Sequence, residues 1–195
     1  MKKFLLVYFL FLYFCFSGIS CFAEQSFANK KKEIIALYNS NNLEEAYNMI
    51  SKITEDERDY EIWYILGNLA QDFNNDTNAA FYLQKSIVMK PNFDKAHYNL
   101  GNIYLKEKKY NSAINEYKLA IKYNGNFAYY YYNLGCAYFE QKNYKDAKSA
   151  FQKAIKYKPT EADFYYNLAV VCNCLGKDKE KQAAFEKYNS LKKEI

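Results

Sequence analysis

A segment of this chain repeats every 34 residues, and that period constrains the fold more than any other feature. Gly67, Gly101 and Gly135 lie at this spacing, each directly after a leucine, and Ala169 follows one period later. A fixed period in this range indicates one small supersecondary unit that is copied and stacked. The functional question therefore concerns a long repeated surface rather than one enclosed catalytic pocket.

Each copy contains two stretches with the pattern of a helix. Apolar residues recur at three- and four-residue steps, first in an aromatic-rich stretch such as YYYYNLGCAYF and then in one such as AKSAFQKAIKY. A short polar segment separates the two stretches. A turn with Pro91, Gly125 or Pro159 follows the second, and proline cannot continue the hydrogen-bond ladder of a helix. The four copies span residues 60–93, 94–127, 128–161 and 162–195.

The repeated glycine predicts a close contact between the two helices of a copy. Glycine inside a helix costs about 1 kcal/mol relative to alanine, so its return at one register indicates a helix packed against that position. We expect its partners to be small residues of the second helix, namely Ala79, Ala113, Ala147, Ala120 and Ala154. Larger side chains are expected to fill the remaining core, among them Trp63, Tyr117, Phe151 and Phe185.

This pattern resembles the tetratricopeptide repeat, a helix–turn–helix unit of 34 residues. One copy matches it at Trp63, Leu66, Gly67, Ala79 and Pro91, and another at Leu134, Gly135, Tyr138, Ala147, Phe151, Ala154 and Pro159. The chain departs from it at His97, Tyr131, Gly125 and Lys181. The resemblance implies an all-α fold, an α-solenoid of stacked helix pairs that forms a right-handed superhelix.

The two ends of the array differ from its middle. Residues 27–59 are interpreted as a degenerate first copy, with Ala46 at the position of Ala79 but with no glycine and one residue fewer. In the copy at 162–195, Lys181 and Gln182 make the last helix more polar. A polar outer face is expected where no further repeat covers the end, so this copy is predicted to be a cap.

The amino terminus has the layout of an export signal. Lys2 and Lys3 precede an apolar stretch at residues 4–16, and small residues flank Phe22 before Glu24. Three fates remain open: cleavage after Ala23, lipidation at Cys21, or retention of residues 1–23 as a membrane anchor. In each case the repeats are predicted to lie outside the cytoplasm, periplasmic or anchored to the cell envelope, with membrane contact only through this segment.

Charge and composition exclude several classes of function. Without Lys2 and Lys3 the chain has 25 basic and 22 acidic residues, a net charge of +3, which is a solvated surface rather than a nucleic-acid footprint. No phosphate-binding glycine loop and no nucleophile with a histidine base are recognisable, so the chain is not predicted to be an enzyme. Cys136, Cys172 and Cys174 are interpreted as packing residues, although a bridge from Cys136 to the next repeat remains open, and no metal or cofactor is predicted.

In the tetratricopeptide family the first helix of each unit lines a concave face. The resemblance implies that the second, fifth, sixth, ninth and twelfth residues of each copy face inward. The candidates for a peptide-binding groove are Tyr64, Asn68, Tyr98, Asn99, Asn102, Tyr132, Asn133, Tyr166 and Asn167. Asparagine amides can donate to and accept from a peptide backbone, and tyrosines add apolar area with few rotors to order. The alternative is that the tyrosines pack between repeats and the asparagines brace neighbouring helices.

Some members of the family clamp a terminal carboxylate with two asparagines and several basic residues. The basic positions of such a clamp are occupied here by Tyr64, Tyr129 and Asn133, or by Tyr98, Asp163 and Asn167. A carboxylate would meet no positive charge, so this mode is not expected. The sequence predicts a non-catalytic scaffold, a monomer or weak oligomer, that binds a partner peptide or helix in its groove. The alternative function is a structural envelope component that self-assembles through the ends of the array.

Overall fold

The computed structural model of the chain describes residues 25–193. By its internal contacts the chain divides into two units, and the boundary in the sequence falls between Arg58 and Asp59. The predicted signal segment at 1–23, with Cys21, lies outside the described residues. The described part is helical, and none of its helices is long and apolar enough to span a bilayer. The all-α fold predicted from the repeat is therefore confirmed.

The first unit contains a helical hairpin. One helix covers residues 25–39, and helix α2 (Leu43–Ser51) follows after a tight turn at Asn41, where φ is 63°. A short 3₁₀ helix, η1 (Glu55–Glu57), comes next. It begins with a capping box between Thr54 and Glu57. Ile34, Ala46 and Ile50 are fully buried. That this hairpin is a diverged copy of the repeat remains a prediction.

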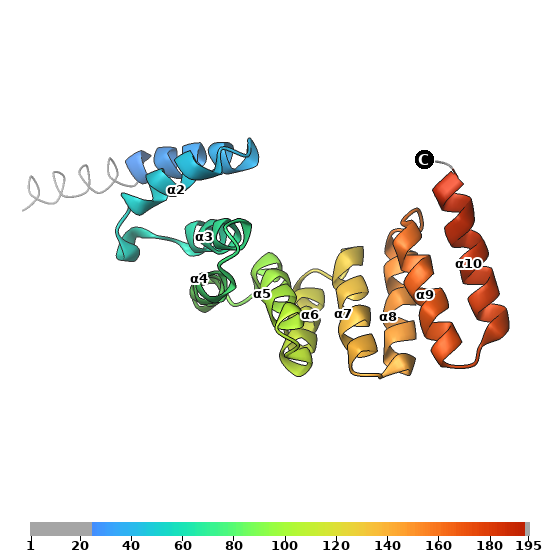
Figure 1. Ribbon diagram of the computed structural model, residues 1–195. Helices are drawn as coiled ribbons and strands as arrows, with labels where there is room; N and C mark the ends of the chain where they lie inside the picture. Colours follow the sequence, from blue (N-terminus) through green and yellow to red (C-terminus); the bar gives the residue numbers. More distant parts are fainter. Residues whose placement is uncertain (1–24, 194–195) are drawn as a thin grey trace, which may run out of the picture. The chain divides into compact units, whose positions relative to one another are not determined.

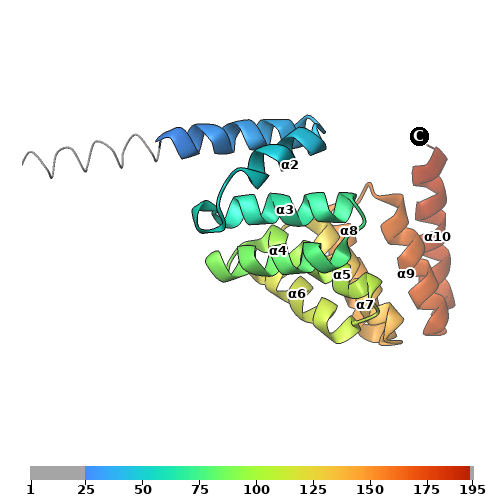
Figure 2. The same cartoon turned by 60° about the vertical axis from the view of Figure 1, so that its left-hand side comes forward.

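The second unit is a solenoid of helix pairs (Figure 1). Residues 59–193 form eight helices, in which each odd-numbered helix packs on the next even-numbered one and each even-numbered helix packs on the first helix of the following pair. Figure 2 shows α9 and α10 running side by side as the last pair. The helices are α3 (Tyr60–Asp72), α4 (Asp76–Met89), α5 (Asp94–Lys106), α6 (Tyr110–Tyr123), α7 (Ala128–Glu140), α8 (Tyr144–Tyr157), α9 (Ala162–Cys174) and α10 (Asp178–Lys193).

One left-handed residue ends the first helix of every pair. Asn74, Lys108, Lys142 and Gly176 all have φ between 57° and 66° and lie 34 residues apart. The next backbone N–H reaches back to a carbonyl of the last turn, for example from Lys109 to Tyr104 at 2.8 Å. This pairing satisfies carbonyls that a helix end leaves without an internal partner. The chain thus reverses direction between paired helices at one left-handed residue in each repeat.

The repeated glycines make room for large side chains rather than for the predicted alanines. A Cβ atom at Gly67 would lie 2.7 Å from Leu83, at Gly101 2.7 Å from Tyr117, and at Gly135 2.6 Å from Phe151. The predicted alanines are fully buried on the same second helices, but Ala79, Ala113 and Ala147 lie one turn before the covering residue, and Ala120 and Ala154 lie one turn after it. The close contact was predicted correctly, but the nearest side chains were not; of the alanines, only Ala79 comes close, with its carbonyl 3.5 Å from a Cβ at Gly67. The core role expected for Phe185 is also wrong, because 43% of its side chain is exposed.

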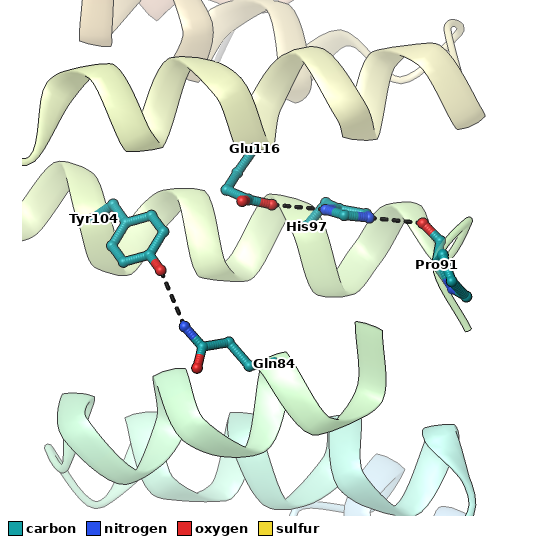
Figure 3. A network of polar contacts seen from close by, with 5 residues as sticks. All are labelled: Gln84, Pro91, His97, Tyr104 and Glu116. Carbon is teal, nitrogen blue, oxygen red and sulfur yellow. Dashed lines mark hydrogen bonds and ion pairs between the residues drawn. The ribbon is translucent and has the colours of Figure 1, made fainter. Parts of the chain in front are cut away.

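In three of the repeats, an aromatic residue at the fourth position bonds to the turn before the repeat. His97 Nε2 lies 2.9 Å from the Pro91 carbonyl, and its Nδ1 lies 2.7 Å from a Glu116 carboxylate oxygen (Figure 3). Tyr131 donates in the same way to Gly125, at 3.0 Å. Burial alone lowers the pKa of His97, but the bonds to Glu116 and Pro91 outweigh it and the pKa is raised. Since both ring nitrogens face acceptors, the imidazolium form fits this site.

The last helix pair is closed by its own side chains. Tyr188 on α10 occupies the register at which Ser86, Ala120 and Ala154 lie in the earlier repeats, and its ring centroid is 5.4 Å from that of Tyr166. A pocket of about 370 Å³ nevertheless remains open between α9 and α10, lined by Tyr166, Ala169, Val170, Asn173, Lys181, Gln182 and Phe185. The outer end of the solenoid is therefore partly capped and partly apolar.

Candidate functional site

Neighbouring first helices are joined by a repeated side-chain contact, which we call a rung. A rung consists of the fifth and ninth residues of one repeat and the sixth residue of the next. It therefore lies along α3, α5, α7 and α9, on the positions that the sequence assigns to the groove. The first rung is Tyr64, Asn68 and Asn99, the second is Tyr98, Asn102 and Asn133, and the third is Tyr132, Cys136 and Asn167.

The first rung is polar and closed. Asn99 Nδ2 donates to Asn68 Oδ1 at 2.6 Å and lies 3.4 Å from the Tyr64 hydroxyl. Asn68 is buried, with 8% of its side chain exposed. Hydrogen bonds of this kind contribute about 1 kcal/mol each, and leaving a buried partner without one costs more. The amide hydrogens of Asn99 are thus used to hold two repeats together.

The second rung has the same geometry and one additional bond. Asn133 Nδ2 donates to Asn102 Oδ1 at 2.8 Å and to the Tyr98 hydroxyl at 3.0 Å. The hydroxyl of Tyr117, which reaches the rung from α6, also donates to Asn102 Oδ1, at 2.9 Å. Tyr117 is fully buried, so its hydroxyl needs a partner inside the protein and finds it in the rung.

The rings of Tyr98 and Tyr132 pack on the next repeat, and that of Tyr64 packs on Phe93, the residue that precedes α5, while the three hydroxyls accept the asparagine bonds. The ring of Tyr64 lies 5.0 Å from Phe93, that of Tyr98 lies 4.9 Å from Tyr130, and that of Tyr132 lies 4.7 Å from Phe164. Aromatic pairs at such distances are stabilising. Tyr166 lies in the last repeat that the structure describes, and 46% of it is exposed. The geometry therefore includes the bracing that the sequence left as an alternative to groove contacts.

The asparagines keep one polar atom for other partners. Within residues 25–193, Asn99, Asn133 and Asn167 make their side-chain hydrogen bonds through Nδ2, and none through Oδ1. In the same part of the chain, no buried side-chain nitrogen or oxygen lacks a hydrogen-bond partner. Each of the three Oδ1 atoms therefore retains some contact with solvent, on side chains that are half-buried. They form a row of three acceptors, one in each repeat except that at 60–93, which has Ile65 at this position.

The third rung is incomplete. Asn167 Nδ2 donates to the Tyr132 hydroxyl at 2.6 Å, but Cys136 replaces the asparagine that would accept the other hydrogen. A pocket of about 180 Å³ lies at this position, lined by Cys136, Phe139, Glu140, Phe151, Asn167 and Val170. Burial raises the pKa of the Cys136 thiol to about 12, so the thiol is neutral. It behaves here as a small apolar group.

Of the six residues that line this pocket, only Asn167 was among the groove candidates from the sequence; Cys136 and Phe151 were expected to be packing residues, and Phe139, Glu140 and Val170 were not singled out. Phe139 and Val170 occupy the twelfth and ninth positions of their repeats, which the resemblance already placed on the inner face. The change from asparagine to an apolar residue at the ninth position was the available signal. In the part of the chain that the structure describes, the three cysteines are free, and no cluster of His, Cys, Asp or Glu could hold a metal ion.

Profiles of one family match most of the second unit. Profiles described as tetratricopeptide repeat match residues 60–93, 128–161, 82–115 and 150–183, and one described as TPR repeat matches 101–142. No curated protein sequence matches this chain.

Several solved structures with a similar fold are MamA proteins. "MamA RS-1 ArsTM double mutant" is 22% identical with a TM-score of 0.78, and 86% of this chain and 95% of that one are covered. "MamA 41-end from Desulfovibrio magneticus RS-1" is 22% identical, with a TM-score of 0.77 and coverage of 86% and 96%. A MamA AMB-1 structure is 18% identical, with a TM-score of 0.76 and coverage of 88% and 94%. At such identities the likeness concerns the fold alone. Together with the family profiles and the repeated geometry, it shows that this chain belongs to the tetratricopeptide repeat family.

Proposed function

We propose that this chain is a non-catalytic scaffold that binds a partner peptide or helix along the inner face formed by α3, α5, α7 and α9. The family consists of protein-interaction scaffolds, which supports a protein partner. The observation that carries the proposal is the row of accessible Oδ1 atoms on Asn99, Asn133 and Asn167. Each can accept a hydrogen bond from a backbone N–H of a bound segment.

The rungs also prepare this face for binding. Because Nδ2 of each asparagine is already bonded to a neighbouring repeat, the orientation of its Oδ1 is fixed before a partner arrives. Binding groups that are ordered in advance lose less conformational entropy on association. Half-buried Leu105 and Phe139 lie at the twelfth position of the same face and add apolar area. The face therefore combines a backbone-reading row with apolar contacts.

The proposed site of action is the cell envelope. This part of the proposal depends on the sequence of residues 1–23, in which two lysines precede an uncharged apolar stretch that ends in small residues. Export with cleavage after Ala23, lipidation at Cys21 and retention as an anchor give mature amino termini of different mass. Intact mass spectrometry of the protein from its native host separates them, and an unmodified full-length chain in the cytoplasmic fraction would contradict export.

The binding face is tested by replacing its acceptors. We expect the variant Asn99→Ala/Asn133→Ala to lose the partners that the wild-type chain captures. Asn115→Ala is the matched control, because Asn115 is exposed on α6 and makes no side-chain hydrogen bond to another described residue. Since the exchange also removes bracing bonds, circular dichroism melting must show that the variant is folded at the binding temperature. An unchanged set of partners in a folded variant would place the binding site elsewhere.

One observation favours the alternative of self-assembly through the array ends. The pocket of about 370 Å³ between α9 and α10 exposes Phe185 and Tyr166, and exposed apolar surface of this kind marks contact sites. Light scattering after size exclusion distinguishes the two functions. A mass that rises with concentration, and that Phe185→Lys returns to that of a monomer, would support self-assembly. A monomer at every concentration would exclude it.

A further inference from the structure

The third rung differs from the second by a matched pair of exchanges. Where the second rung has Asn102 and the Tyr117 hydroxyl that bonds to it, the third has Cys136, whose thiol is only a weak donor and acceptor, and Phe151, which has no polar group. The first rung differs from the third at both of these positions too, but it has Leu83 where the second has Tyr117, so its asparagine, Asn68, has no hydroxyl of this kind to bind. The polar bridge between α7 and α9 is thereby reduced to the single bond from Asn167 to Tyr132. The space that the bridge would fill remains open as a pocket.

This pocket has the size and lining of a site for one apolar side chain. Its volume is about 180 Å³, and a buried cavity of about 150 Å³ is large enough for a benzene molecule. Four of its six lining residues are Cys136, Phe139, Phe151 and Val170. An apolar group that enters it exchanges water for carbon and sulfur contacts, which is favourable in proportion to the area buried.

A carboxylate lies at the edge of the pocket. Glu140 is exposed at the end of α7, and its hydrogen bond within the described chain is a long one, 3.4 Å from the Tyr110 hydroxyl. Among residues 25–193, no lysine or arginine forms an ion pair with it. A ligand with a positive charge next to its apolar group would complement this carboxylate.

We propose that the pocket of the third rung anchors one side chain of leucine or methionine size from a partner peptide, with a lysine or arginine of that peptide beside Glu140. This inference rests on the proposed peptide-binding face and adds its specificity. The peptide backbone lies along Oδ1 of Asn167, which lines the pocket, and of Asn133, one turn before Cys136 on α7, while the first two rungs read backbone only. The Cys136 thiol acts by its shape and neutrality, and no reaction at sulfur is involved.

The test is selection of a phage-displayed random peptide library on the purified full-length chain, followed by fluorescence anisotropy with the best synthetic peptide. We expect enriched sequences to contain leucine, isoleucine or methionine next to lysine or arginine. Cys136→Asn should weaken binding about tenfold or more, because an asparagine there closes the rung and fills the apolar site. Val170→Asn is a second variant with the same expectation, and both place the asparagine that Asn68 and Asn102 provide at this register.

Glu140→Gln tests the charge separately. It should reduce the preference for the basic residue, so that replacing this residue of the peptide by alanine weakens binding to the wild-type chain but not to the variant. The control Asn115→Ala should bind like the wild type. Enriched peptides that bind folded Cys136→Asn and Val170→Asn without loss would overturn the pocket while leaving the binding face intact. If the wild-type chain enriches no peptide, the binding face itself is refuted, and the inference fails with it.

Discussion

The second and third rungs occupy equivalent places in the solenoid and differ in what they leave open. In the second, Asn102 accepts from both Asn133 and Tyr117, and the space between the helices is filled by hydrogen bonds. In the third, Cys136 accepts from neither neighbour, and a pocket replaces the bonds. The backbone repeat is the same in both, with left-handed residues at Lys108 and Lys142. Two side-chain positions are therefore enough to change a structural brace into a candidate recognition site.

The joint difference between the second and third rungs at these two positions has a physical reason, and it applies in one direction only, because the first rung combines Asn68 with Leu83, which has no hydroxyl. A tyrosine such as Tyr117 brings a buried hydroxyl that needs an acceptor, which Asn102 supplies. With Phe151 there is no hydroxyl to satisfy, so Cys136 can be apolar without leaving a polar group unpaired. The residue of the second helix thus determines whether the ninth position of the first helix must be polar.

The largest expected effect on stability comes from removing Phe151, the core side chain next to the third rung. Phe151 is 1% exposed and fills the space over Gly135. Phe151→Ala should lower the free energy of unfolding by about 3–5 kcal/mol, because it removes buried apolar area and leaves a cavity. Urea denaturation followed by circular dichroism measures it. A loss below about 1 kcal/mol would mean that the pocket region is not packed as described.

A double-mutant cycle should convert the third rung into a copy of the second. Phe151→Tyr alone places a hydroxyl beside Cys136 and should cost about 1 kcal/mol or more. With Cys136→Asn added, the hydroxyl gains the acceptor that Tyr117 has, and the pair should recover about 1 kcal/mol in coupling. Denaturation of the four proteins gives this coupling. Strictly additive effects would contradict the account of why the two positions change together.

The residue at the fourth position should make the stability of the repeat at 94–127 depend on pH, a dependence that the repeat at 128–161 lacks. His97 and Tyr131 both bond to the preceding turn, but only His97 titrates near neutral pH, and its pKa is raised above 6.5. A raised pKa means that folding favours the protonated form. The stabilisation is therefore complete below about pH 6 and is lost as pH rises through the folded-state value.

The melting temperature should therefore fall by a few degrees between about pH 6 and about pH 8.5. His97→Tyr/Glu116→Gln copies the neutral tie of the third repeat and leaves no unpaired carboxylate. It should flatten this dependence, measured as the slope of melting temperature against pH in differential scanning calorimetry. An equal slope in both proteins would assign the pH response to other groups.

The smallest predicted change in the free energy of unfolding should be equal in the repeats at 94–127 and 128–161. Lys108 and Lys142 adopt positive φ, a conformation that is unfavourable for residues with a Cβ atom and favourable for glycine, which Gly176 provides in the last repeat. Lys108→Gly and Lys142→Gly should each raise the free energy of unfolding by about 0.5–1 kcal/mol. Unequal effects would show that the two repeats differ in their turns as well as in their rungs.

Much of this fold could be predicted from the sequence because glycine, alanine and proline recur at one period. The period identified the helix pairs and the inner-face positions of Tyr98 and Asn133. It could not identify the partner of Gly101, because alanine and tyrosine both lie on the buried side of α6 and only coordinates show that Tyr117 covers the glycine. The pocket could not be predicted, because Cys136 in place of an asparagine indicates only that the ninth position is less polar. The sequence does not show whether neighbouring side chains fill the space that the asparagine would occupy.

Site-specific photo-crosslinking in cells tests the proposed binding face most directly. A benzophenone amino acid is placed at Phe139, inside the third-rung pocket, or at Val88, which is 78% exposed on the second helix of its repeat. The account predicts a discrete adduct with another protein from position 139, mapped by mass spectrometry to a segment with neighbouring apolar and basic residues. A peptide selected on the purified chain should suppress this adduct. Adducts that form equally from position 88, or that the peptide does not suppress, would contradict binding at this face.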